Sequence, residues 1–340
     1  MKLSIIVPVY NMNHDGNLQF CLDSLVNQTI DDYEIIAVDD ASTDDSLCVL
    51  REYEQKYPEK FKAVAYSDNR KQGGAKNEGL KIAVGNWIGF VDSDDWVSKD
   101  CYEKLIEKAE KTGADLVGCN YSIVYSHTFE VGEEVKNFSL NQVGEFDVDM
   151  RRKYMKHPGS MVVKIYKGDV IRNNKLNFPE GIFYEDNCAA LIWAVYFKHY
   201  EVVDEPMYYY YQHDTSTVHT ITVPRCEDRL KASEMMLEEM KRRGFFEEYR
   251  QEIESNFTTT YFVNTLFSYM RIKHGKKISF VKRMKDKMLK EFPNFRSNPE
   301  YGRHMDDEQK KYVDILMKST LRFFVQYSLL WAYRDIRNKR

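Results

Sequence analysis

Two clusters of carboxylates in the first hundred residues have the residue types and the spacing to bind a divalent cation. The run D-D-A-S-T-D occupies 39–44, and the run D-S-D-D occupies 92–95. Because side chains of an extended chain alternate in direction, Asp92 and Asp94 can direct both carboxylates to one side. Mg²⁺ or Mn²⁺ bound by few protein ligands keeps positions open for water and substrate phosphates. The simpler alternative is that these residues only form turns and cap the next helix.

Hydrophobic periodicity predicts the elements that position these clusters. Short apolar segments rich in Val, Ile and aromatic residues predict strands at 3–9, 33–38, 61–66, 86–91 and 115–119. Between them the apolar residues follow a helical period, and a helix is predicted from about 99 to 111 with Ser98 as its N-cap. This alternation predicts right-handed crossovers and a mostly parallel sheet.

The topology of such a sheet indicates where a ligand would bind. In mostly parallel sheets ligands bind beyond the carboxyl ends of the strands. The segments that follow the first, second and fourth predicted strands are 8–13, 39–44 and 92–95. We therefore expect these three segments to meet at one edge of the sheet.

The remainder of the chain divides into a looser region and a helical region. The looser region contains an apolar stretch at 160–167, and the elements predicted in it are a helix at 185–198 and an aromatic strand at 206–212. Nearly every segment beyond Pro224 has a helical period. A domain boundary is therefore predicted at 222–224.

The composition is that of a globular protein of about two domains. The chain has 340 residues, of which 43% are hydrophobic and 30% charged, and this excludes a peptide hormone, a fibrous chain or low-complexity disorder. Six scattered cysteines without a C-x-x-C pair are typical of free thiols in a reducing compartment. Neither a signal peptide nor a transmembrane helix is predicted, so we expect a cytoplasmic protein.

The net charge of −4 conceals an acidic part and a basic part. Residues 1–224 contain 23 Lys and Arg against 36 Asp and Glu, whereas residues 225–340 contain 26 against 17. Nine basic residues and one acidic residue lie in 271–290, with apolar residues at helical spacing. The apolar and aromatic segment 321–333 precedes further basic residues. Such a basic run most often forms a solvated helix face. Peripheral contact of 271–340 with an anionic membrane is the second expectation, and a homodimer contact is a further alternative. No nucleic-acid partner is expected.

Five motifs in a fixed order resemble those of one enzyme family. They are S-I-I-V-P-V-Y-N at 4–11, V-D-D-A-S-T-D at 38–44, A-K-N-E-G-L at 75–80, V-D-S-D-D at 91–95 and Y-E-D-N at 184–187. Each motif alone is weak, but together they resemble the inverting family-2 glycosyltransferases with the GT-A fold. The resemblance covers roughly the first 190 residues and leaves the last part of the chain outside it.

The resemblance implies an α/β fold and separate functions for successive parts of the chain. The GT-A fold has a Rossmann-like, mostly parallel sheet flanked by helices, here with a helical C-terminal extension. The implied parts are a GT-A domain at 1–223, made of a nucleotide-sugar-binding half at 1–120 and an acceptor and catalytic half at 121–223, and a helical basic region at 224–340.

The resemblance also implies contacts with the nucleotide-sugar donor. Pro8 and Tyr10 would line the nucleotide base, Tyr10 by stacking, and Asp40 would form a hydrogen bond with the uracil ring. Asn69 would be a polar base contact, and Lys76 would place a cation near the donor phosphates. The family more often has Arg at the position of Lys76, and a lysine keeps the charge but lacks the bidentate fork.

The D-x-D motif and a later histidine are implied to bind the cation and the phosphates. Asp92 would contact the ribose or a metal-bound water, Ser93 would belong to the donor site, and Asp94 would bind the Mg²⁺ or Mn²⁺ that bridges the two donor phosphates. The cation would act as a Lewis acid for the leaving diphosphate. His213 is a further candidate for phosphate or metal contact, and a surface histidine is its alternative. Asp95 is expected to be a cap or a supporting group.

Asp186 corresponds to the catalytic base of the family. An acceptor hydroxyl is a poor nucleophile at neutral pH, so a carboxylate within hydrogen-bonding reach must take its proton as the hydroxyl attacks the anomeric carbon. Glu185 would orient the acceptor or the base. The alternative is that both acids lie in the first turn of a helix only because the macrodipole favours them there.

The function expected from these observations is that of a metal-dependent, inverting glycosyltransferase of the hexosyltransferase type. It would move a sugar from a nucleotide-sugar, with UDP as the expected nucleotide, to a glycan or lipid-linked glycan at the inner face of the plasma membrane, in surface polysaccharide biosynthesis. A sugar-phosphate nucleotidyltransferase is one alternative, although Y-N-M-N at 10–13 replaces its glycine-rich loop. A non-catalytic glycan-binding or scaffold member of the fold is another.

Overall fold

The computed structural model describes residues 1–212, 221–303 and 305–337. The chain divides into two compact units, Met1–Thr215 and Ser216–Arg340, which are described separately below. The predicted boundary at 222–224 coincides with the start of the first helix of the second unit, where the Thr222 side chain accepts a hydrogen bond from the Arg225 N–H.

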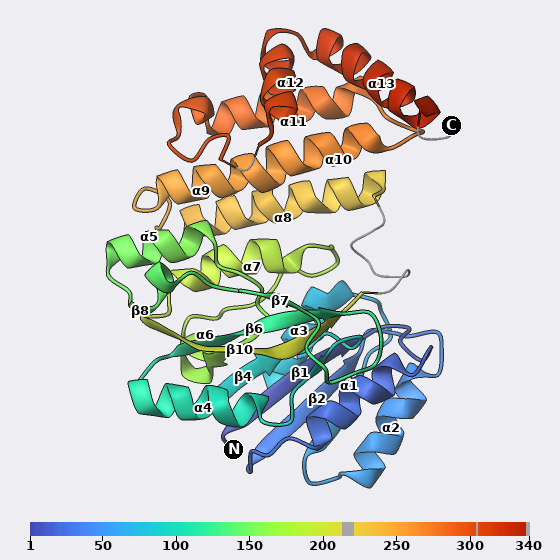
Figure 1. The fold of residues 1–340 in the computed structure, drawn as a ribbon, viewed down its shortest axis with the longest axis vertical. Helices are drawn as coiled ribbons and strands as arrows, with labels where there is room; N and C mark the ends of the chain where they lie inside the picture. The colour runs from blue at the N-terminus through green and yellow to red at the C-terminus, as the bar shows by residue number, and fades with distance from the viewer. Residues whose placement is uncertain (213–220, 304, 338–340) are drawn as a thin grey trace. The chain divides into compact units, whose positions relative to one another are not determined.

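The first unit is built on one mixed sheet (Figure 1). Over the described residues its strand order is β3-β2-β1-β4-β9-β6-β10-β5, with β7 paired to β6 and β8 paired to β10. The strands are β1 (Leu3–Val9), β2 (Tyr33–Asp39), β3 (Phe61–Ala65), β4 (Trp87–Phe90), β5 (Trp96–Val97), β6 (Leu116–Val124), β7 (Glu133–Val135), β8 (Gly144–Glu145), β9 (Lys164–Lys167) and β10 (His199–Tyr211).

Most neighbouring long strands are parallel, as the sequence predicted. β1 pairs in parallel with β2 and β4, β2 with β3, and β6 with β10. β9 lies antiparallel between β4 and β6, and this inversion leaves β6 and β10 running in the direction of β1. The carboxyl ends of β1, β2, β4, β6 and β10 therefore share one edge of the sheet.

Helices cover both faces of this sheet. They are α1 (Asn17–Val26), α2 (Ser46–Lys56), α3 (Lys71–Ile82), α4 (Cys101–Thr112), α5 (Val148–Lys156), α6 (Gly168–Asn173) and α7 (Glu185–Ala194), with a 3₁₀ turn η1 (Leu140–Gln142). β1 and β2 are buried along their whole length, as expected for strands with a helical layer on each side. The mostly parallel, doubly covered sheet is the predicted α/β architecture.

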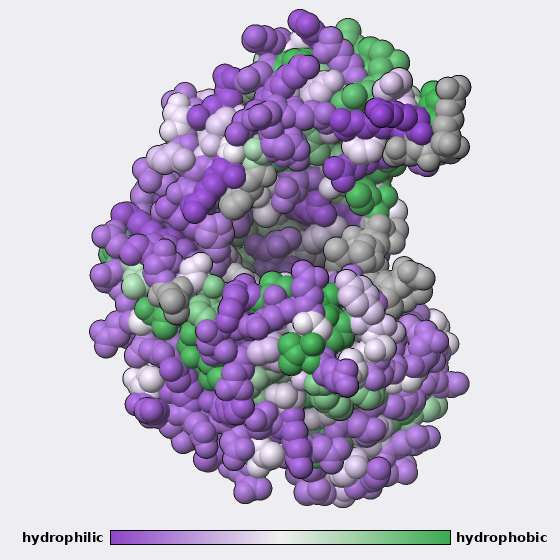
Figure 2. All heavy atoms as spheres, viewed as in Figure 1, coloured by the Kyte–Doolittle hydropathy of each residue, from purple (hydrophilic) through white to green (hydrophobic). Residues whose placement is uncertain are grey.

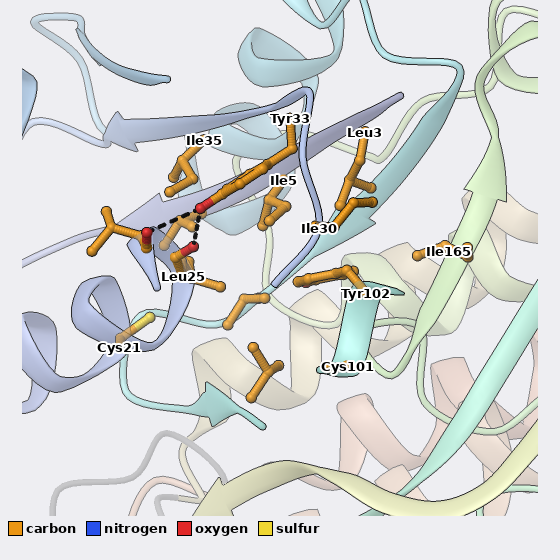
Figure 3. Close-up of a cluster of buried hydrophobic side chains, with 14 of the residues drawn as sticks. Leu3, Ile5, Cys21, Leu25, Ile30, Tyr33, Ile35, Cys101, Tyr102 and Ile165 are labelled. Carbon is orange, nitrogen blue, oxygen red and sulfur yellow. Dashed lines mark hydrogen bonds between the residues drawn. The ribbon is translucent and has the colours of Figure 1, made fainter. Parts of the chain in front are cut away.

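Alternate residues of β1 serve the two layers. Leu3, Ile5 and Val9 belong to a core cluster that includes side chains of α1 and α4 (Figure 3). In the same cluster the Tyr33 hydroxyl donates hydrogen bonds to the last carbonyls of α1. On the other face, a Cβ at Gly79 would lie 2.5 Å from Ile6 Cγ2. The glycine therefore lets α3 lie close to β1 and brings its A-K-N-E segment toward the ligand edge.

Several predicted elements differ from those observed. The predicted helix at 185–198 ends at Ala194, and the strand predicted at 206–212 begins at His199 with register shifts around Pro206. Ser98 is not the N-cap of α4, because the helix begins after Asp100 and the Ser98 hydroxyl instead donates to the Asp100 carboxylate. A proline inside a strand interrupts the hydrogen-bond ladder, and this hid the first half of β10 in the sequence.

The second unit is helical over the residues described. Its helices are α8 (Val223–Arg242), α9 (Arg250–Phe257), the π-helical η3 (Thr258–Asn264), α10 (Thr265–Arg271), α11 (Ile278–Glu291), the 3₁₀ turn η4 (Phe295–Ser297), α12 (Asp307–Lys318) and α13 (Thr320–Arg337). The apolar side of α11, which includes Val281, Met284 and Met288, is buried. Most apolar residues of the basic run at 271–290 therefore form core, and Ile278 is the exposed exception. No helix in the described ranges is long and apolar enough to cross a bilayer.

Candidate active site

The loops after β1 and β2 are tied together at the ligand edge. The Asp40 N–H donates to the Val9 carbonyl at 2.8 Å. Asn11 donates from its N–H to the Ser42 hydroxyl at 3.0 Å and accepts on Oδ1 from the Thr43 N–H at 2.7 Å. Pro8 is buried within β1, whereas Tyr10 is 45% exposed at the end of the strand. The structure thus places an exposed aromatic ring on a fixed backbone, as the base-stacking hypothesis requires.

Asp40 is buried and holds the chain that follows β3. Its Oδ1 accepts hydrogen bonds from the Tyr66 hydroxyl and the Arg70 N–H, both at 2.7 Å. The Asn69 amide donates to the Asp40 carbonyl at 2.9 Å. Burial raises the pKa of the Asp40 carboxyl, and these hydrogen bonds oppose the rise. Asp40 and Asn69, predicted as base contacts, therefore lie together, and Tyr66 is a partner that the sequence did not reveal.

Asp39 differs from Asp40 in leaving one oxygen unsatisfied. Its Oδ2 accepts a hydrogen bond from the Ser42 N–H at 3.1 Å. Its Oδ1 is buried and has no hydrogen-bond partner among the described residues. A buried carboxylate oxygen without a donor is costly. One oxygen of Asp39 therefore supports the loop, and the other has no donor among the described residues.

The D-S-D-D segment forms a turn directly after β4. The Asp95 N–H donates to the Asp92 carbonyl at 3.0 Å. The Asp95 carboxylate is buried, where it accepts hydrogen bonds from the Tyr208 hydroxyl at 2.6 Å and the Tyr211 N–H at 2.9 Å. Burial, with Asp94 and Asp92 nearby, raises the pKa of Asp95 well above its ordinary value. Asp95 therefore anchors the turn to β10, the supporting role expected of it.

Asp92 faces the interior of the site. Its Oδ1 is buried without a hydrogen bond, and the Lys76 Nζ lies 3.9 Å from it. Burial raises the pKa of Asp92 to about 6, Lys76 acts against this rise, and Asp94 adds to it. The carboxylate thus lies where a second positive charge would stabilise its ionised form.

The D-S-D-D turn offers few oxygen ligands. It therefore suits a hard divalent cation whose other ligands come from a substrate. The described residues contain no group of three or more His, Cys, Asp or Glu side chains arranged to hold a metal. The unsatisfied Asp92 Oδ1, two residues before Asp94 and beside the buried Ser93, is a suitable oxygen donor for Mg²⁺ or Mn²⁺. His213, the remaining predicted ligand, lies outside the described residues.

Lys76 joins the turn after β4 to the first turn of α7. Its Nζ is 2.8 Å from Glu185 Oε1 and 3.9 Å from Asp92 Oδ1. Lys76 and Glu185 are both buried, with 3% of each exposed. Burial alone would lower the pKa of Lys76, but Glu185 and Asp92 raise it above its ordinary value. The structure places this predicted phosphate-binding cation between two acidic motifs.

The segment before α7 is fastened to α3 by the A-K-N-E-G-L motif. Asn77 donates from Nδ2 to the Phe178 carbonyl and accepts on Oδ1 from the Phe178 N–H, both at 2.8 Å. A Cβ at Gly73 would overlap the Pro179 carbonyl oxygen. Tyr184, with φ of +67°, then turns the chain into α7. Gly73 and Asn77 are therefore positioning residues that the sequence analysis missed, and Asn77 lay inside a motif it had quoted.

The two acids of α7 have different environments. Glu185 is buried on Lys76, whereas the Asp186 side chain is exposed and accepts a hydrogen bond from the Asn187 N–H at 2.8 Å. Desolvation by the surrounding protein and the charge of Glu185 raise the pKa of Asp186, and Lys76 opposes the rise. An accessible carboxylate of raised basicity is suited to accept a proton from a substrate hydroxyl.

Solved structures share this fold. The crystal structure of S. aureus TarS 1–349 in complex with UDP-GlcNAc has a TM-score of 0.64 and 20% identity, covering 98% of this chain and 92% of that chain. The mannosyltransferase PcManGT from Pyrobaculum calidifontis, in complex with GDP-Man and Mn²⁺, has a TM-score of 0.51 and 13% identity, covering 96% of this chain and 87% of that chain. At these identities the likeness establishes the GT-A fold.

Sequence relatives and a family model agree with the fold. The chain is 29% identical to the uncharacterized glycosyltransferase YibD of Escherichia coli (strain K12), over 63% of this chain and 62% of that protein. It is 34% identical to the poly(ribitol-phosphate) beta-glucosyltransferase of Bacillus spizizenii, over 54% of this chain and 27% of that protein. Each match thus spans less than two thirds of the relative. Residues 4–166 match the model of glycosyl transferase family 2, so this part of the chain is similar to that family.

Proposed function

We propose that this protein transfers a sugar from a UDP-sugar to a hydroxyl group of a cell-surface polymer, with inversion at the anomeric carbon. The observation that carries the proposal is the Lys76 ammonium group between Glu185 and Asp92, which joins the acidic turn of α7 to the D-S-D-D turn. A general base and a diphosphate-binding segment are thereby held in one site. The complexes of TarS with UDP-GlcNAc and UDP support UDP as the nucleotide.

The donor would lie along the carboxyl edge of the sheet. Tyr10 would stack on the base above the loop that Asn11 ties to the chain after β2, and Asp40 with Asn69 would shape the base pocket. Asp92 and Ser93 would position the ribose and the diphosphate. Lys76 supplies positive charge at this point, although its Nζ also holds Glu185.

Asp186 would act as the general base. It accepts the proton of the acceptor hydroxyl while that oxygen forms a bond to the anomeric carbon on the side opposite the diphosphate. The bond between the anomeric carbon and the phosphate oxygen breaks, and UDP leaves with the bonding electrons. One displacement inverts the configuration, and the Lys76–Glu185 pair fixes the helix turn from which Asp186 projects.

Asp92 and Asp94 would hold a Mg²⁺ or Mn²⁺ ion. When bound, the ion stabilises the negative charge that develops on the leaving diphosphate. Lys76 contributes a fixed positive charge to the same carboxylate and remains protonated because its acidic neighbours raise its pKa.

The acceptor class is proposed from the relatives. The poly(ribitol-phosphate) beta-glucosyltransferase and the minor teichoic acid biosynthesis protein GgaB both belong to cell-wall polymer synthesis by their names. We therefore propose a glycan or lipid-linked glycan of the cell surface as acceptor, with transfer on the cytoplasmic side of the membrane.

The test is UDP release by the purified full chain with UDP-glucose or UDP-GlcNAc, Mn²⁺ and a cell-wall polymer. Asp186→Asn should lower the rate about 10²- to 10⁴-fold, because the base is lost, while UDP affinity stays within about threefold. Asp149→Asn, on a carboxylate exposed on α5, is the matched control. An Asp186→Asn rate within twofold of wild type would remove the proposed base. Release of pyrophosphate would identify a nucleotidyltransferase, and no turnover by wild type would leave a binding protein.

A further inference from the structure

The last helix presents an apolar face to solvent. On α13, Leu321, Val325, Leu329, Tyr333 and Ile336 follow one another at spacings of three and four residues, which places them on one side of a helix. Their exposed fractions lie between 47% and 66%. Figure 2 shows hydrophobic atoms gathered over this helix, at the upper right of the view. We call these five side chains the α13 stripe.

The opposite side of α13 is anchored in the second unit. Phe323 and Tyr327 are buried, and their rings stack at 5.6 Å between centroids. The Arg334 guanidinium makes two hydrogen bonds to the Glu308 carboxylate of α12, at 3.0 and 2.6 Å. These contacts fix which side of α13 packs on the second unit. The α13 stripe therefore lies on the outer side of a packed helix.

The unpaired charges on the exposed side of α13 are positive. Arg322 and Arg337 are exposed between and beside the stripe residues, and no ion pair is formed by either within the described chain. The helix's acid, Asp335, is part of an ion pair with Lys273 at 3.8 Å. The exposed face thus combines apolar side chains and a tyrosine with two uncompensated arginines.

These charges discriminate between the partners that could cover the stripe. If two copies paired through this face, each copy would bring its two unpaired arginines toward those of the other, and these like charges oppose the pairing. An anionic lipid surface compensates both arginines and takes up the apolar stripe at the boundary of headgroups and acyl chains. We propose that α13 is an interfacial helix that binds a membrane rich in anionic lipid.

This proposal narrows the membrane contact expected for 271–340 to α13. The basic run at 271–290 has most of its apolar side chains in the core, and several of its charges have internal partners, such as Arg283 on Glu227 at 2.5 Å and Lys285 on the carbonyls that end α12. Among the helices described in this unit, α13 alone has more than one exposed large apolar side chain. The proposal does not depend on sugar transfer.

The experiment is co-sedimentation of the purified full chain with phosphatidylcholine vesicles that contain either no phosphatidylglycerol or 40% of it. Wild type should bind the anionic vesicles at least tenfold more tightly and lose this difference in high salt. The double variant Val325→Glu and Leu329→Glu should bind at least 30-fold more weakly. Arg322→Gln with Arg337→Gln should weaken binding roughly 25-fold, since each interfacial charge contributes about a factor of five.

Val84→Glu is the matched control, because Val84 is 61% exposed in the first unit and should leave binding unchanged. Thermal unfolding checks that each variant is folded, as expected for exposed positions. The proposal is overturned if wild type does not sediment with anionic vesicles, or if the α13 variants bind as wild type does. A dimer in light scattering that Leu329→Glu converts to a monomer, without vesicle binding, would assign the stripe to a second copy. Asp186→Asn should bind vesicles as wild type does. A failure of the proposed catalytic role would therefore leave the result for α13 unchanged.

Discussion

Lys76 carries the strongest electrostatic coupling of the site. Its ammonium group is buried with Glu185 at 2.8 Å, and it faces Asp92 as well. Lys76→Met would leave two acidic groups without their counter-charge, and we expect the free energy of unfolding to fall by roughly 3–5 kcal/mol, as for other broken buried pairs. Urea unfolding at pH 7 measures this loss.

A second variant distinguishes the lost pairing from lost packing. In the double variant Lys76→Met and Glu185→Gln the carboxylate charge is removed together with the ammonium, so part of the lost stability should return. Non-additivity of at least about 1 kcal/mol is expected for two side chains in contact. Additive effects would show that the Lys76–Glu185 pair contributes no coupling energy.

The Asp92 carboxyl makes the free energy of unfolding decrease as the pH rises, which is the opposite of the usual effect of a carboxyl group. Its folded pKa of about 6 lies above the ordinary value of 3.8, so between these values the folded state binds more protons than the unfolded state. Stability from this group is therefore full below about pH 4 and declines as the pH rises to about 6. Asp92→Asn should abolish this decline and raise the stability at pH 7 relative to wild type by about 2 kcal/mol.

The measurement is urea unfolding of both proteins from pH 4 to 8 with chelator present, so that no divalent cation binds. The difference between wild type and Asp92→Asn isolates this carboxyl from the others that titrate. A difference that stays constant across this range would show that the Asp92 pKa is not raised. Added Mn²⁺ should stabilise wild type more than Asp92→Asn, because an ion that binds only the folded state shifts the equilibrium.

Hydrophobic periodicity predicted the strands of the first unit that are continuous apolar segments. The motifs predicted the residues of the site but not the contacts between them. β1 and β2 match their predicted positions because strands buried on both faces are continuous apolar runs. The antiparallel insertion of β9 and the pairing of Lys76 with Glu185, 109 residues away, depend on contacts between distant segments. No local pattern encodes such a contact, so the charge of Lys76 could be predicted but its partner could not.

Close packing of α3 on the segment before α7 gives a prediction for Gly73. In Gly73→Ala the new methyl group would overlap the Pro179 carbonyl and crowd Glu185 Cβ at 3.2 Å. A backbone oxygen cannot rotate away as a side chain can, so α3 and the start of α7 must separate. We expect transfer to fall at least tenfold with UDP affinity within about threefold, measured by UDP release and by calorimetric titration with UDP.

Gln72→Ala, one residue earlier on the exposed side of α3, is the control and should change neither quantity. If Gly73→Ala kept the wild-type transfer rate, the contact between α3 and the segment at Pro179 would have no role in placing Asp186. A loss of UDP affinity as large as the loss of rate would instead indicate damage to the donor loops.

The uneven charge of the chain follows the division into two units. The acidic excess of residues 1–224 includes the carboxylates of the site, whereas several basic residues of 225–340 form ion pairs inside the second unit. What remains on α13 are arginines beside an exposed apolar stripe. Chemistry and membrane contact would thus reside on different units of one chain.

This separation predicts that the two activities can be lost independently. Val325→Glu with Leu329→Glu should leave hydrolysis of a UDP-sugar in solution within about twofold of wild type, because neither residue belongs to the donor site. Transfer to an acceptor embedded in anionic vesicles should fall at least tenfold, since the enzyme no longer concentrates at the surface. Both rates are measured as UDP release, with Val84→Glu as control. Equal loss of both rates in the α13 variant would mean that α13 acts on the catalytic site itself, and equal retention would separate catalysis from membrane binding altogether.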